Sequence, residues 1–159
     1  MQHMAFLAAG EILDSTPDTL TVSINPERPI SLSFFSSMKI GRVGTPDQAS
    51  DNGVWIASLL DLAATKMTVV QQRAESKDYV DTHAILNTGL SLEEALGAAQ
   101  AVYGKQFNAA ITLKALSYFE DGDLSKLPRQ VQDYLIEQST GVRKLSRIRR
   151  VSDELAPEP

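Results

Sequence analysis

The spacing of apolar residues changes once along this chain, at Ser58, and no other feature of the sequence limits the fold as much. Upstream, residues 19–24 and 30–35 alternate apolar and polar side chains, which is typical of strands with one buried face. The turn-forming residues 25–29 join these two runs, so we expect a β-hairpin. Downstream, the spacing is helical to the end. The order predicts an α+β fold, a small antiparallel sheet of three or four strands followed by a helical bundle of about five helices.

Weaker signals fill in the rest of the chain. We expect one single α+β domain over residues 1–141 and a basic-then-acidic tail over 142–159 that is partly disordered. Ser58 is a good N-cap for the first helix of the bundle, and Ser91 with Glu94 forms a capping box for the third. The remaining expected elements are a helix at 5–13, short strands at 39–44 and 54–57, and helices at about 59–74, 77–87, 91–103, 108–119 and 128–140.

Composition excludes several classes of protein. The chain has no cysteine, so it has no disulfide framework and no thiolate nucleophile, and its two histidines exclude a multi-histidine metal site. No apolar run approaches the roughly 18 residues of a membrane span, and the first residues lack the basic start of a secretory signal. We therefore expect a cytoplasmic protein with no membrane partner.

Charge is distributed unevenly along the chain. The net charge is −5. Residues 1–141 carry 10 Lys and Arg against 17 Asp and Glu, a balance of −7, whereas residues 142–150 carry five basic residues and no acidic one. Three acidic residues follow and return the sum to −5. Such a basic segment is either a contact for nucleic acid or, more commonly, a solvated helix end.

The first helix of the bundle contains two cations in an unexpected place. On a helical wheel its apolar stripe includes Leu59, Leu62 and Met67, with Asp61 on the opposite face, yet Lys66 and Arg73 lie near the middle of that stripe. A buried cation requires a partner. Asp78 and Asp81 follow at once, spaced i, i+3 at the start of the next helix.

This pattern has two interpretations. Four charges of this kind can form a structural ion-pair cluster that fixes two helices in register, which spacing alone favours. Alternatively, they form a polar pocket in which Lys66 contacts a phosphate-bearing ligand and Asp78 orients it.

Residues 58–86 also carry a recognisable motif, in which a Leu-x-Asp-Leu-x-x-x-Lys opening is followed by Arg and then by Lys-Asp-Tyr-x-Asp. The segment resembles the helix pair of the AbiEii/AbiGii family of nucleotidyltransferase-type toxins. The strand pair that ends in Ser-Phe-Phe and the later ITLKALSYFEDGD, residues 111–123, are similar to other segments of that family, so the resemblance covers about residues 5–127. The matched positions of the helix pair are Leu60, Leu62, Lys66, Arg73, Lys77, Asp78, Tyr79 and Asp81.

The resemblance implies a function. Members transfer a nucleotidyl group from an NTP with Mg²⁺, in toxin–antitoxin or phage-defence systems of prokaryotes, and RNA is the acceptor for some of them. It implies that Lys66 and Asp78 are the catalytic positions, with Lys66 on phosphate and Asp78 positioning the nucleotide or acceptor. Arg73, Lys77 and Asp81 would support them, and an antitoxin or other protein would be the partner.

One part of the family pattern is missing. The family carries a Gly-Gly or Gly-Ser turn followed by a metal-binding Asp-x-Asp upstream of the strand pair, and this sequence has neither Gly pair. Its Asp-x-Asp, Asp121-Gly122-Asp123, follows a late helix and is expected to be a turn. We therefore expect a truncated or short form, corresponding to the C-terminal half, that is inactive alone and contributes no metal ligand. The alternative is a non-catalytic interaction module that pairs with a partner or with the missing N-terminal half.

Overall fold

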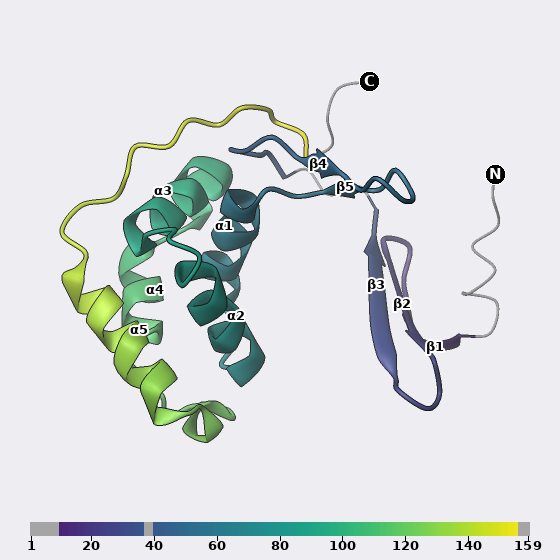
Figure 1. Ribbon diagram of the computed structural model, residues 1–159, viewed down its shortest axis with the longest axis horizontal. Helices are drawn as coiled ribbons and strands as arrows, with labels where there is room; N and C mark the ends of the chain where they lie inside the picture. Colours follow the sequence, from purple (N-terminus) through teal and green to yellow (C-terminus); the bar gives the residue numbers. More distant parts are fainter. Residues whose placement is uncertain (1–9, 37–39, 156–159) are drawn as a thin grey trace. The chain divides into compact units, whose positions relative to one another are not determined.

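A computed structural model describes residues 10–36 and 40–155 of the chain (Figure 1). These two ranges belong to two separate compact units, which are described in turn. The first contains a three-stranded antiparallel sheet, and the second contains five α-helices in the part that the structure describes. The expected α+β order of a small sheet followed by a helical bundle is confirmed.

The first unit is an antiparallel sheet in the order β1-β2-β3. Strands β2 (Thr19–Ile24) and β3 (Ile30–Phe35) have the expected bounds, and Val22 pairs with Leu32 in their register. Strand β1 (Glu11–Ser15) corrects the expected helix over residues 11–13, because these residues pair with β2 instead. The rest of that expected helix lies mostly outside the described residues.

The apolar side chains of this sheet are largely exposed. Val22 is buried, whereas Ile12, Leu13, Ile30 and Phe35 are at least half exposed. The alternating pattern therefore predicted β2 and β3 correctly. The apolar side chains of the sheet, however, are not buried by the described residues of this unit.

The second unit opens with a short ribbon in which β4 (Asp47–Gln48) pairs with β5 (Trp55–Ile56). The expected strand at 54–57 is therefore confirmed. The expected strand at 39–44 is wrong over its described part, where a single bridge joins Arg42 to Ser152 instead of a ladder. The partner of this bridge lies far along the chain, which local alternation cannot reveal.

Three helices of the described part, α1, α3 and α4, begin at residues whose side chains cap them. The Ser58 side chain accepts a hydrogen bond from the Asp61 N–H, and Ser91 with Glu94 forms the expected capping box. The first helix ends at Val69, five residues before its expected end. The bounds are α1 Leu59–Val69, α2 Ser76–Leu86, α3 Leu92–Tyr103, α4 Ala109–Ala115 and α5 Arg129–Gly141, with short 3₁₀ turns η2 at Gly104–Gln106 and η3 at Leu124–Lys126.

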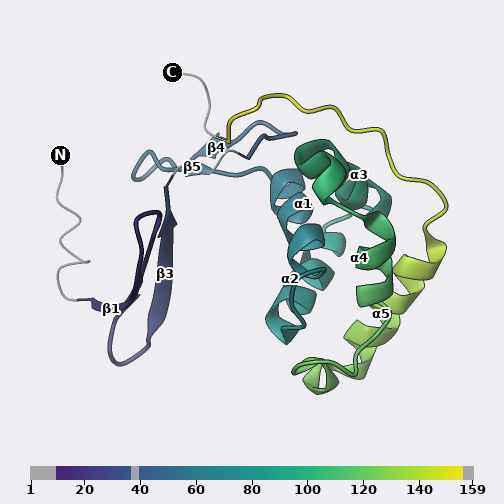
Figure 2. The same cartoon turned by 180° about the vertical axis from the view of Figure 1, so that it is seen from behind.

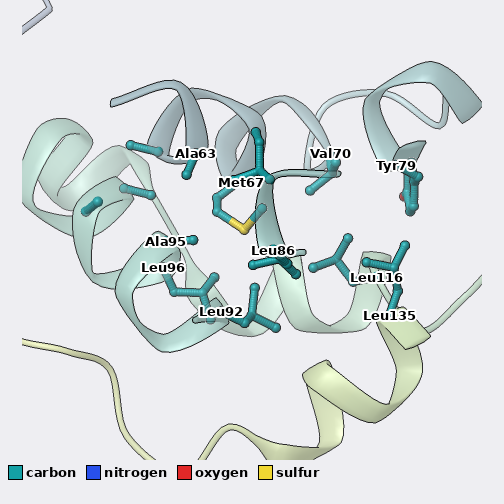
Figure 3. Close-up of a cluster of buried hydrophobic side chains, with 14 of the residues drawn as sticks. Ala63, Met67, Val70, Tyr79, Leu86, Leu92, Ala95, Leu96, Leu116 and Leu135 are labelled. Carbon is teal, nitrogen blue, oxygen red and sulfur yellow. The ribbon is translucent and has the colours of Figure 1, made fainter. Parts of the chain in front are cut away.

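The core of the second unit lies between α1 and the helices around it. Helix α1 packs mainly against α3, and Met67 lies fully buried among side chains of several helices (Figure 3). Leu92 and Leu96 of α3 and Leu135 of α5 are also completely buried. Burial of a Leu or Met side chain contributes about 1.5–3 kcal/mol, so this apolar cluster stabilises the positions of α1 and α2.

Beyond α5 the chain runs in an extended conformation along α3 and reaches the segment near β4 (Figures 1 and 2). The Ser146 N–H donates to the carbonyl of Glu93 at 3.1 Å. Gly97 on α3 allows this approach, because a Cβ built there would lie 2.2 Å from the carbonyl oxygen of Ser146.

Candidate functional site

The site is formed where α1 and α2 meet at a tight turn. Helix α1 ends at Val69, and residues 70–75 reverse the chain before α2 starts at Ser76. The carboxylate of Asp123 accepts hydrogen bonds from the N–H of Ser76 at 2.6 Å and from its hydroxyl at 2.8 Å. A distant loop therefore caps α2 and fixes where its first turn lies.

The neighbouring Gly122 explains why this loop packs so closely. Its φ is +57°, and a Cβ there would lie 2.0 Å from the carbonyl oxygen of Ala74. Only glycine suits such a backbone at such a distance. The expectation that the Asp121-Gly122-Asp123 segment forms a turn is confirmed. Asp123 in this turn uses both carboxylate oxygens to accept hydrogen bonds from Ser76 at the start of α2.

Four of the predicted site residues meet at this helix pair. Lys66 Nζ lies 2.9 Å from Asp78 Oδ1 and 2.6 Å from Asp81 Oδ2. Arg73 Nε donates to Asp78 Oδ2 at 2.8 Å. The Asp78 side chain is only 1% exposed and thus lies beneath both cations, while the Asp81 side chain is 53% exposed.

Lys77 lies at the edge of this cluster. Its Nζ is 2.8 Å from Glu75 Oε2, and the other oxygen of Glu75 lies 3.4 Å from Arg73 Nη1. The charges therefore alternate in sign along one chain of contacts. Among the described residues, Lys77 reaches Asp78 only through Glu75 and Arg73, so the structure does not bring it to the centre of the site.

The charged states of Asp78, Lys66 and Arg73 are stabilised by their neighbours. Burial disfavours the charge on Asp78, but hydrogen bonds from Arg73 and Lys66 outweigh it and hold the pKa of Asp78 below its ordinary value. Burial likewise opposes the charge on Lys66, yet the hydrogen bonds to Asp81 and Asp78 raise its pKa. The hydrogen bond to Asp78 raises the pKa of Arg73. All of these groups are therefore ionised near neutral pH.

Tyr79 anchors α2 beside this cluster. It is buried, its ring meets Phe119 edge to face at 6.0 Å, and burial raises the pKa of its hydroxyl to about 12. Since Tyr79 follows Asp78 directly, its packing holds the first turn of α2 in the rotation that points Asp78 toward α1.

Asp61 is a buried carboxylate whose position was missed. It accepts hydrogen bonds from the backbone N–H groups of Val43 at 2.7 Å and Gly44 at 3.1 Å, and from the Ser58 hydroxyl at 2.6 Å. The wheel placed it in solvent and placed Leu62 in the core, yet Asp61 is buried and Leu62 is exposed. Two sequence features could have indicated that Asp61 has a structural role. It lies at the third position after the N-cap Ser58, and it is the Asp of a Leu-x-Asp-Leu motif that begins at Leu59.

A pocket of about 280 Å³ opens between the α1–α2 turn and α4. Its lining includes Tyr79 and the polar residues Gln71, Arg73, Lys114 and Asp121. Arg73 thus belongs both to the ion-pair cluster and to the pocket.

Comparison with known proteins identifies the family of this chain. The model of the family described as "Nucleotidyl transferase AbiEii toxin, Type IV TA system" matches residues 8–151. The chain belongs to the AbiEii family of nucleotidyl transferase toxins. Membership covers most of the sequence and includes both the sheet and the helix pair that holds Lys66 and Asp78. The family is one of toxin–antitoxin systems.

A further relative is a protein of Aquifex aeolicus (strain VF5) named "Uncharacterized protein aq_aa25", which is 30% identical over 93 residues. The match covers 58% of this chain and 44% of that protein, so it spans less than half of the relative's length. No solved structure matches the chain. No helix in the described ranges is both long and apolar enough to cross a membrane.

Nucleotidyl transfer from an NTP generally uses divalent metal ions that carboxylates hold. The described residues do not fit such a metal site. In residues 10–36 and 40–155, no three His, Cys, Asp or Glu side chains come together in a way that could hold a metal ion. The carboxylates of Asp78 and Asp81 already contact Lys66, and Asp123 caps α2.

Proposed function

We propose that the α1–α2 helix pair binds the phosphate end of an NTP, with Lys66 contacting a phosphate oxygen and Asp78 fixing the position of Lys66. The observation that carries this function is the unequal burial of the two carboxylates on Lys66. Asp78 holds the ammonium from the protein interior, and Asp81 covers it from the solvent side. A lysine held in this way is preorganised, so little side-chain entropy is lost when a ligand binds.

Binding requires one exchange of partners. The Asp81 side chain is more than half exposed, and an exposed ion pair contributes at most about 1 kcal/mol. A phosphate oxygen can therefore replace Asp81 on Lys66 at small cost. Asp78 remains in place because it is buried and Arg73 holds its second oxygen. In this scheme Arg73 and Asp78 position Lys66, and Lys77 adds positive charge at the edge.

We further propose that this chain alone transfers nucleotidyl groups slowly or not at all. Transfer requires Mg²⁺ to bridge the triphosphate, and the described residues supply no group of carboxylates for it. Catalysis would then require metal-binding carboxylates from another polypeptide segment. An RNA acceptor, a role in phage defence and a cytoplasmic location follow from the resemblance and are part of the same proposal.

Isothermal titration calorimetry with Mg·ATP tests the binding step. We expect the wild-type chain to bind and the Lys66→Ala variant to lose binding at least tenfold. The Asp81→Asn variant should bind more tightly, because it removes the carboxylate that competes with phosphate. The Lys105→Ala variant removes an exposed cation outside the cluster and is the matched control, with unchanged affinity.

The alternative function is a non-catalytic module that binds a protein. The exposed apolar side chains of the β1-β2-β3 sheet favour it, because contiguous exposed apolar surface marks interaction sites. The calorimetric series discriminates between the two functions. If neither the wild-type chain nor Asp81→Asn binds Mg·ATP, the ion-pair cluster is structural and the module becomes the better assignment.

A further inference from the structure

The extended segment 142–150, which we term the strap, is fixed to the surface of the helical unit. The Ser146 N–H donates to the Glu93 carbonyl at 3.1 Å, in the middle of the strap. At its end, Arg150 Nε donates to the carbonyl of Ala101 at 3.1 Å, and the Arg42 N–H donates to Ser152 just beyond at 2.9 Å. The strap therefore keeps one face toward α3 and the other toward solvent.

Apolar and basic side chains take opposite faces of the strap. Val142, Leu145 and Ile148 are partly buried and pack against the core. The basic side chains between them are exposed, and none forms a salt bridge within the described part of the chain. They are Arg143, Lys144, Arg147 and Arg149.

The charge of the strap contrasts with the rest of the protein. Residues 1–141 sum to −7, and the strap carries five cations and no anion. One of the five, Arg150, is bound to helix carbonyls and to Asp153 at 2.7 Å. Four uncompensated cations thus lie within seven residues of an extended segment on an otherwise acidic protein, which favours binding of a polyanion.

We propose that the strap binds the phosphate backbone of a nucleic acid. An extended chain rises about 3.3 Å per residue, so residues 143–149 span roughly 20 Å. Along the axis of a double helix each strand has a phosphate about every 3.4 Å, so a length of about 20 Å spans roughly six phosphates of one strand. Because the strap is held by backbone hydrogen bonds, its cations are presented in a fixed register. The surface is separate from Lys66 and does not depend on nucleotide binding there.

The same observations argue against other anionic partners. A segment that binds a membrane surface inserts apolar side chains beside its cations, but Leu145 and Ile148 pack against the core of this protein. A protein partner is usually held by an aromatic or aliphatic anchor, and the strap has no aromatic residue. Exposed cations without an apolar anchor favour a phosphate backbone.

The test is fluorescence anisotropy with a labelled 20-nucleotide poly(U) RNA at several salt concentrations. The strap variant replaces Arg143, Lys144, Arg147 and Arg149 with Gln. The control variant replaces four exposed cations elsewhere, Arg28, Lys105, Lys126 and Arg129, with Gln. Both variants lower the net charge from −5 to −9, by 4 in each case, so a difference between them reports position rather than total charge.

We expect the wild-type chain to show a slope of log K against log salt of about −3, which corresponds to four contacts at roughly 0.7 each. The strap variant should lose at least tenfold in affinity at low salt, and the single Arg147→Gln variant should reduce the slope by about 0.7. The control should bind like wild type. Circular dichroism melting should show that all variants fold.

Several results would overturn the proposal. If the strap variant and the control variant lose the same affinity for RNA, or if the affinity of the wild-type chain does not depend on salt, the strap is not the binding surface. Tighter binding to phosphatidylserine vesicles than to RNA at the same salt would indicate a membrane surface. Full displacement of RNA by an equal charge concentration of polyglutamate would indicate a general anion site.

Discussion

Replacing Asp78 with Asn tests how much the ion-pair cluster contributes to stability. The substitution keeps the shape of the side chain but removes the charge that faces Lys66 and Arg73. Breaking a buried pair commonly costs about 3–5 kcal/mol. Here the cost is lower, because Lys66 keeps Asp81 at 2.6 Å and the Arg73 side chain is 46% exposed, so water can solvate it. We expect a loss of about 2 kcal/mol, between the buried-pair value and the 0–1 kcal/mol of a surface pair.

Urea unfolding followed by circular dichroism measures this loss. With an m-value of roughly 2 kcal/mol/M, the midpoint for Asp78→Asn should fall by about 1 M at an unchanged m-value. Asp81→Asn is the matched control, because it removes the same charge from the same lysine at an exposed position and should shift the midpoint by less than half as much. If the two variants shift the midpoint equally, the burial of Asp78 does not increase its contribution to stability.

Three further predictions concern packing and pH. Gly97→Ala should destabilise the protein by about 1–2 kcal/mol, despite the roughly 1 kcal/mol gain in helix propensity, because the new Cβ would lie 2.2 Å from the carbonyl oxygen of Ser146. Gly141→Ala is the control and should not destabilise the protein, because a Cβ there would have nothing within 4 Å. Thermal melts of both variants check this prediction. Asp61→Ala should cost about 3 kcal/mol in urea unfolding, since two backbone N–H groups lose their acceptor, and a loss under 1 kcal/mol would contradict its assigned role. Asp78 has a folded pKa below its ordinary 3.8, so its contribution is complete above pH 3.8 and is lost as pH falls through the folded value. Unfolding free energies at pH 5 and pH 2.5 should therefore differ less for Asp78→Asn than for wild type.

Local patterns were sufficient for the elements whose partners are close in sequence. Strands β2 and β3 were predicted with their correct bounds, because strict alternation on both sides of a Pro-containing turn specifies a hairpin. The capping box at Ser91 located the start of α3 for the same reason. The spacing of Lys66, Asp78 and Asp81 also predicted their meeting, since it depends only on two helices and a tight turn.

Predictions were wrong where a segment distant in the sequence determines the local structure or the burial of a side chain. Asp61 looks solvent-facing on a wheel, but its carboxylate binds backbone 17–18 residues upstream, and periodicity contains no information about that segment. The end of α1 was placed too late because residues 70–75 form a turn, and the distant loop at Gly122 packs closely against Ala74 of that turn. Strand β1 was predicted as helix over residues 11–13 because pairing with β2 overrides the helical propensity of that segment.

The structure adds an asymmetry that the sequence does not contain. Asp78 and Asp81 lie one turn apart on α2, and their spacing alone gives no reason to assign them different degrees of burial. One is almost completely buried and bound to two cations, and the other is half exposed and bound to one. An exposed ion pair contributes little to stability, so the contact between Asp81 and Lys66 can be exchanged at small cost. The exposed Asp81 therefore argues for an exchangeable partner on Lys66, so a tighter Mg·ATP complex in Asp81→Asn would separate a phosphate site from a structural cluster.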